Sequence, residues 1–296
     1  MKKGIILILS LVSFSFLYSQ VDDTQIPPPL TAPWEVVEVS ERPGPVPYPS
    51  VKQNDVMWQV TIWREIDLRE KRNHALYFPT EPQGNFRSLA QVIFDAIDMM
   101  NPDNENALPL YTDENCNIKR DRNEIQSVLR NSRQIQQFDP DTGDPIDDIT
   151  IDDPFTASQI MYYRLKEVWF FDKNRGELNV RILEIEPFFE YEKDGANLNE
   201  DDVADFTKRR LGYIKYDELR PYLSQQQYHT GNPALQLTFD DVLTWKRYFS
   251  SYIIAEGNIQ NNREIQDYIK NPRDQRLESE RIMNRIRNFE SELWEY

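Results

Sequence analysis

One acidic loop has the oxygen-rich spacing that a calcium ion requires. Asp139, Asp141 and Asp144 stand two and three positions apart around Gly143, and hard cations prefer carboxylate oxygens. The loop departs from the EF-hand pattern, because the glycine comes one place early and no glutamate closes it. A solvated acidic loop that keeps the chain soluble is the alternative. We therefore predict no metal site and keep these three aspartates as the calcium candidates.

The residue types that enzymes use lack suitable neighbours in this sequence. His74 and His229 are the only histidines and Cys116 is the only cysteine, and no zinc-ligand spacing is present. The sequence contains no Gly-x-Ser-x-Gly, no glycine-rich phosphate loop and no Gly-x-Gly-x-x-Gly. Carboxylates are so frequent that no single pair marks a general acid and base. We predict a non-enzyme without a cofactor, and a periplasmic hydrolase that uses acidic residues is the enzymatic alternative.

The N-terminus predicts export. Lys2 and Lys3 precede the apolar run 4–17, and Ser19 stands at a plausible cleavage site. The run is shorter than the roughly 20 residues of a membrane span, and a retained N-terminal anchor is the alternative. No cysteine follows it that could carry a lipid. Removal of 1–19 changes the formal net charge from −16 to about −18, which disfavours nucleic acid and anionic membrane surfaces as partners.

Residues 20–50 predict an extended arm rather than a domain. Proline precludes helix and central strand, and the arm contains Pro27, Pro28, Pro29, Pro33, Pro43, Pro45, Pro47 and Pro49. Trp34 also lies there, and a plain linker would not need it. The arm lies either along its own domain or along a neighbouring subunit, and the sequence leaves both open. We predict that 51–296 forms a single domain.

The elements that must position any site follow from periodicity. Alternation predicts a strand from Val56 to Leu68 with an apolar face and a polar face. Trp63 is the exception on the polar face, where an aromatic ring either packs under a loop or marks a contact surface. A hairpin is predicted from the strands 158–171 and 177–186, with Gly176 in its turn and Pro187 ending its second strand.

Apolar residues at helical spacing predict several helices. They favour a helix over 86–100, a second over 121–137, and a long terminal helix over 277–293. A further helix is predicted to begin with a capping box of Thr238 and Asp241 and to continue through Phe249 and Tyr252. The predicted fold class is therefore α+β: an antiparallel sheet, built from the Trp58 strand and the 158–186 hairpin, is packed by helices. The C-terminal third is predicted to be helical.

The tryptophans and the charges divide between core and surface. From their apolar strand or helix faces, we assign to the core Trp58, Trp169 and Trp245. The predicted interface anchors are Trp34, Trp63 and Trp294. The predicted inter-subunit charges are Arg64, Asp67, Arg69 and Glu70. Exposed ion pairs of small energetic value are the alternative for these charges.

Four separated segments resemble one known family. Residues 66–71 read Ile-Asp-Leu-Arg-Glu-Lys, and 166–173 read Lys-Glu-Val-Trp-Phe-Phe-Asp-Lys. Residues 247–253 read Arg-Tyr-Phe-Ser-Ser-Tyr-Ile, and 293–296 read Leu-Trp-Glu-Tyr. Together they are similar to the GldN/PorN family of the type IX secretion and gliding machinery of Bacteroidetes.

This resemblance implies a non-catalytic structural subunit of a periplasmic ring under the outer membrane. The implied partners are a GldK/PorK-type outer-membrane lipoprotein, a GldM/PorM-type motor protein and further copies of the chain. Attachment to the outer membrane would be peripheral, through a partner, without direct membrane insertion. A monomeric calcium- or glycan-binding module in the periplasm is the alternative from another class.

Overall fold

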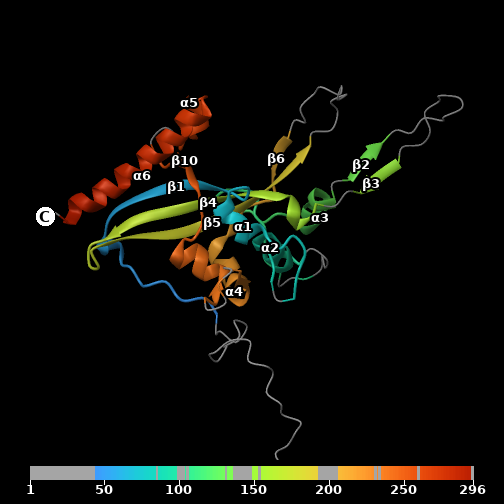
Figure 1. Ribbon diagram of the computed structural model, residues 1–296, viewed down its shortest axis with the longest axis horizontal. Helices are drawn as coiled ribbons and strands as arrows, with labels where there is room; N and C mark the ends of the chain where they lie inside the picture. The colour runs from blue at the N-terminus through green and yellow to red at the C-terminus, as the bar shows by residue number, and fades with distance from the viewer. Residues whose placement is uncertain are drawn as a thin grey trace, which may run out of the picture. The chain divides into compact units, whose positions relative to one another are not determined.

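An antiparallel sheet stands at the centre of the part of the chain that the computed structural model describes. The described residues are 44–84, 86–98, 104, 107–130, 132–135, 149–152, 155–192, 206–229, 232, 235–258 and 261–294. Among them, six strands form one sheet in the order β10-β1-β4-β5-β6, with β7 paired to β5 (Figure 1). These strands are β1 (Val56–Asp67), β4 (Ile160–Asp172), β5 (Glu177–Glu192), β6 (Phe206–Arg210), β7 (Ile214–Lys215) and β10 (Tyr252–Glu256). The predicted α+β class is confirmed.

The hairpin of β4 and β5 is the longest pairing in the sheet. Gly176 in its turn has φ 65°, a conformation that glycine adopts without steric cost, and its N–H donates to the Asp172 carbonyl at 2.8 Å. The prediction that Pro187 ends β5 is wrong, because the strand runs on to Glu192. Pro187 lies between the segments that pair with β7 and β6, where its carbonyl accepts from the Leu211 N–H at 3.0 Å. A backbone N–H donor is not required at this position of β5, because neither β6 nor β7 pairs with Pro187.

Helix α2 (Leu89–Ile97) is shorter than the predicted span 86–100. Ser88 begins it with a capping box, in which its hydroxyl accepts from the Gln91 N–H and the Gln91 side chain accepts from the Ser88 N–H. Asp98 ends it in the left-handed conformation, with φ 52°. The side chains at both ends therefore set the length of the helix.

The second predicted helix, 121–137, is also too long. Helix α3 (Arg122–Arg130) ends early, and β2 (Ser132–Ile135) follows it and pairs with β3 (Ile149–Asp152). Local hydrophobic spacing does not report such a pairing, because the partner strand lies more than ten residues further along the chain.

Thr238 and Asp241 form the predicted capping box, with bonds of 3.0 and 3.1 Å. The turn that follows is a π-helix over Asp241–Lys246, and Arg247 ends it with φ 51°. The predicted continuation through Phe249 and Tyr252 is wrong, because Tyr252 begins β10 at the edge of the sheet. The remaining elements are α1 (His74–Tyr77), α4 (Tyr216–Gln225), β8 (Gln227–Tyr228), β9 (Leu237–Thr238), α5 (Ile265–Tyr268) and α6 (Pro272–Trp294).

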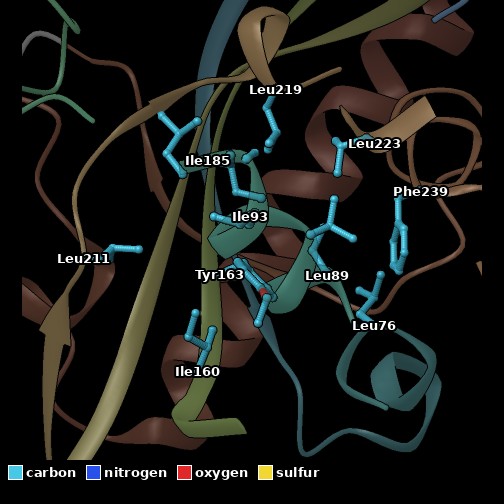
Figure 2. Close-up of a cluster of buried hydrophobic side chains, with 14 of the residues drawn as sticks. Leu76, Leu89, Ile93, Ile160, Tyr163, Ile185, Leu211, Leu219, Leu223 and Phe239 are labelled. Atoms are coloured by element: carbon cyan, nitrogen blue, oxygen red, sulfur yellow. The ribbon is translucent and has the colours of Figure 1, made fainter. Parts of the chain in front are cut away.

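The apolar face of β1 is covered in two parts. Ile66 and the following Leu68 belong to a large cluster that α2 and α4 build with the far end of the hairpin. Figure 2 shows Leu89 and Ile93 of α2 and Leu219 and Leu223 of α4 around Tyr163 of β4.

The first half of β1 packs against α6 instead. Ile62 is fully buried there with Ile282 and Ile286 of α6, and the Trp58 ring lies 4.8 Å from the Phe289 ring. The predicted terminal helix is thus confirmed, although Leu277 at its start is 55% exposed. In the described part of the chain, no helix combines the length and the apolar character that a membrane span requires.

Candidate assembly surface

A single buried carboxylate joins the two apolar clusters. Glu167 of β4 is 0% exposed. It accepts hydrogen bonds from the Trp169 indole N–H at 2.8 Å and from the Arg247 guanidinium at 2.6 Å. The Arg64 guanidinium lies 3.8 Å from the same carboxylate, and burial lowers its pKa. Because an unpaired buried charge is costly, this group holds the π-helix segment, β1 and β4 in one arrangement.

Glu65 organises the polar side of the sheet. It is 5% exposed and accepts from the Lys208 ammonium at 2.8 Å and from the Tyr252 hydroxyl. The Arg164 guanidinium lies 3.8 Å from its other oxygen. Lys208 also lies 3.5 Å from the centre of the Tyr162 ring. Glu65 is therefore bound to β4, β6 and β10 of the same chain.

A cavity of about 890 Å³ opens beside this group and is lined by residues of β1, β10, α5 and α6. Its basic side chains include Arg164 and Lys208, and its acidic ones include Glu65 and Glu264. Arg164 pairs with Glu264 at 2.9 Å. The lining holds six basic and four acidic side chains. Because Arg164 and Lys208 are already paired with Glu264 and Glu65, an anionic ligand would have to displace these intramolecular pairs.

Trp63 packs under a loop, which is the first of the two alternatives for this residue. Its indole N–H donates to Glu114 at 2.9 Å, and the Lys166 ammonium lies 5.8 Å from its ring. Only 8% of Trp63 is exposed. The interface roles of Trp63 and Arg64 stay predictions, and their burial in their own chain is a physical reason to prefer more exposed residues.

Arg69 is the most accessible of the predicted interface charges. Its side chain is 58% exposed and pairs with Asp67 at 2.8 Å. Burial opposes ionisation of Asp67, but the hydrogen bonds from Arg69 outweigh it and lower the Asp67 pKa. Glu70 follows at intermediate exposure. Arg69 and Glu70 therefore remain available to a neighbour.

Glu186 carries a strongly shifted carboxyl group on the same polar side. Burial raises its pKa to about 7, and it is 2% exposed. Its Oε2 lies 2.8 Å from Arg210 Nε, but the two atoms are not aligned for a hydrogen bond. Attraction between the two charges thus offsets only part of the burial cost.

The end of the proline-rich arm is clamped on its own domain. Arg220 of α4 is 5% exposed, binds Asp240 through two bonds of 2.8 and 3.0 Å, and donates to the Val46 carbonyl at 2.5 Å. The Tyr48 ring lies 4.2 Å from the Arg220 guanidinium and 5.1 Å from that of Arg181. Residues 44–50 therefore follow the first alternative for the arm, contact with its own domain.

The assignment of Trp245 to the core is wrong. This side chain is 39% exposed and covers the arm, with its ring 5.7 Å from that of Tyr48. Trp169 is buried as predicted, with 7% exposed. Trp58 is half-buried. The π-helix explains the error for Trp245, because its wider turn changes the face on which successive residues lie.

Several residues named in the sequence predictions lie outside the part of the chain that the structure describes. The signal peptide 1–19, Trp34 and the calcium candidates Asp139, Asp141 and Asp144 lie outside the described residues. Trp294 is in the last turn of α6, but its side chain is outside the description. Among the described residues, no group of three or more histidines, cysteines or carboxylates is placed to hold a metal ion.

Sequence reasoning missed the Glu167 group and the Arg220–Asp240 pair. Glu167 shares a strand face with Leu165 and Trp169, and a carboxylate on an apolar face could have indicated a buried charge. Arg220 offered no such sign, because its partner and the arm that it binds are distant in sequence.

Comparison with known proteins gives one result for the whole described domain. A family model described as "Gliding motility associated protein GldN" matches residues 51–295. No curated protein matches the sequence. The matched span includes the whole sheet, both apolar clusters and α6, and it begins just after the clamped end of the arm.

Proposed function

Because the chain belongs to the GldN family of gliding motility associated proteins, we propose that it is a non-catalytic structural subunit of a periplasmic ring. In this proposal the ring lies under the outer membrane and is required for type IX protein secretion and gliding. The family match across 51–295 is the observation that carries it. The match spans 51–295, so the proposal concerns this whole span rather than one element within it.

The geometry supports a scaffold in two ways. The buried charges of the sheet, Glu65 and Glu167, are bound within the chain, so they stiffen the domain rather than wait for a substrate. The described end of the arm is fixed to the domain, because the Arg220 guanidinium packs on the Tyr48 ring and the Arg181 guanidinium binds the Pro49 carbonyl. A rigid body with a tethered arm is suited to repeated assembly.

The proposed partners are a GldK/PorK-type lipoprotein, a GldM/PorM-type motor protein and other copies of this chain. The lipoprotein would hold the subunit at the outer membrane, so the chain itself would be peripheral to that membrane. The export signal predicted at 1–19 supports a periplasmic location.

Size measurement tests the proposal directly. Mature protein beginning at Gln20 is examined by light scattering alone and with the lipoprotein. We expect assembly larger than one copy, or a stable complex with the lipoprotein. A monomer that ignores the lipoprotein contradicts the proposal, and a calcium-dependent rise in its melting temperature would favour the calcium-binding module instead.

The arm is tested in the same assay. A variant that lacks 20–43 keeps the clamped residues from Gly44 onward, so its melting should stay cooperative while its assembly weakens. A variant in which 20–43 is replaced by a flexible Gly/Ser linker of equal length is the matched control for chain length. Unchanged assembly in both variants would refute a role for the arm.

A further inference from the structure

Near the hairpin turn, the two edges of the sheet differ in what covers them. On the outer side of β5, no described strand pairs with residues 177–183. The described end of the arm lies there instead, where the Arg181 guanidinium donates to the Pro49 carbonyl at 2.7 Å. Proline has no N–H to offer, and native sheets use it to block an edge.

The opposite edge, formed by β1, is open over its first half. Strand β10 pairs only with Ile62–Glu65, and the last backbone bond on this side runs from the Gly257 N–H to the Thr61 carbonyl at 2.7 Å. Within the described residues, no backbone group pairs with 56–60 on this side. Because outward-pointing backbone groups alternate along a strand, the N–H and carbonyl of Gln59 point outward with those of Thr61.

Apolar side chains lie beside the open edge. Trp58 and Val60 are only partly buried where they pack toward α6, and the neighbouring Met57 is 51% exposed on the other face. A strand added beside β1 would gain backbone hydrogen bonds from Gln59 and side-chain contact with Trp58. This is the geometry of strand addition to a sheet edge.

We propose that residues 34–42 of the arm of a second copy add as a strand to the open edge of β1, 56–60. The inference rests on the proposed function, since it specifies how copies of the ring subunit contact one another. Residues 34–42 form the longest stretch of the arm without proline, between Pro33 and Pro43, and they include Trp34 and three valines. Valine and tryptophan favour strands.

The arm of the same copy is poorly placed to lay the whole of this stretch along its own edge. Arg42 is two residues before Gly44, a reach of at most ~7 Å. The arm lies beside β5, and the open edge lies on the far side of β5, β4 and β1. Four strand spacings separate them, roughly 19 Å even straight through the sheet. To cross this distance at ~3.3 Å per residue, a donor from the same copy would use about six residues, 38–43, and would leave only 34–37 for pairing. The arm of another copy can offer the whole stretch 34–42, so we assign the donor to a second copy.

Donor and acceptor lie on opposite edges of one sheet, so the contact is heterologous. Each copy gives its arm on the β5 side and receives an arm on the β1 side. Contacts of this kind build a ring when the rotation closes and a filament when it does not. The geometry thus accounts for self-association without a two-fold dimer.

Disulfide trapping tests the contact in the full mature chain. The native thiol is removed by Cys116→Ser, and Gln59→Cys is combined with Val37→Cys. We expect a ladder of disulfide-linked oligomers under mild oxidation, and a linked pair when the single variants are mixed. The matched control replaces Gln59→Cys by Glu177→Cys, an exposed position at the same end of the sheet on the edge that the arm covers. This control should not give the ladder.

Proline substitution gives an independent measurement that leaves the folded domain untouched. Val37→Pro lies in the proposed donor strand and should raise the concentration needed for assembly about tenfold. Thr24→Pro, in the arm before its first proline Pro27, should leave that concentration unchanged. The inference is overturned by a disulfide within one copy, by an equal ladder from Glu177→Cys, or by normal assembly of Val37→Pro. If these results occur while the wild type still assembles, the proposed function stands and only this contact is wrong.

Discussion

Removal of the Glu167 carboxylate should destabilise the domain more than any surface substitution. Two changes separate the effects of charge and shape. Glu167→Ala removes the acceptor of both the Trp169 N–H and the Arg247 guanidinium and leaves Arg64 without its counter-charge. Glu167→Gln keeps one oxygen as an acceptor but removes the negative charge.

The magnitude follows from the burial of the group. Glu167 is 0% exposed, and the Arg64 and Arg247 side chains are 12% and 22% exposed. Loss of one partner from a buried ion pair costs about 3–5 kcal/mol, so we expect this loss for Glu167→Ala. Loss of a charge-assisted hydrogen bond, with an acceptor retained, costs about 1–3 kcal/mol, the range expected for Glu167→Gln. Against a typical stability of about 5–15 kcal/mol, the first change is severe.

Urea denaturation followed by tryptophan fluorescence measures both variants. The matched control is Glu177→Gln, an exposed glutamate on the neighbouring strand β5, which should change the free energy of unfolding by less than about 0.5 kcal/mol. If Glu167→Ala and Glu167→Gln both lie within 1 kcal/mol of the control, roughly the error of such comparisons, the carboxylate does not join the two clusters and this reasoning is wrong.

Two further predictions concern stability. Burial raises the pKa of Glu186 to about 7, above the value of about 4.3 for an unfolded glutamate. Between these two pH values the folded state binds more protons than the unfolded state. The free energy of unfolding therefore falls as pH rises through this window. Glu186→Gln should remove that part of the slope, so its melting temperature should gain on the wild type between pH 5 and pH 8; parallel pH profiles would contradict the shift. Trp169→Ala, at a buried position, should cost about 3–5 kcal/mol of unfolding free energy, whereas Trp245→Ala, at a position 39% exposed, should cost under about 1.5 kcal/mol. Equal losses in chemical denaturation would show that Trp245 belongs to the core.

Local pattern predicted those elements whose boundaries depend on nearby residues. The alternation of β1, the turn at Gly176 and the capping box of Thr238 each involve residues close in sequence, and each is present. The predictions failed where distant contacts decide. Pro187 is accepted inside β5 because β6 and β7 leave a gap beside it, and Trp245 is half-exposed because a π-helix redirects it.

The sequence by itself determined the α+β class, the apolar face of β1, the terminal helix and the family, because these depend on residue type and on periods of two or 3.6 along the chain. Only the tertiary structure decided which charged side chains are buried and what they bind. Whether Glu65 and Glu167 face water or a hydrogen-bond donor depends on Lys208 of β6, Tyr252 of β10 and Arg247, which are far away in sequence. The same holds for the open edge of β1. Which residues of a strand stay unpaired depends on the register and length of its neighbours in the sheet, here β10.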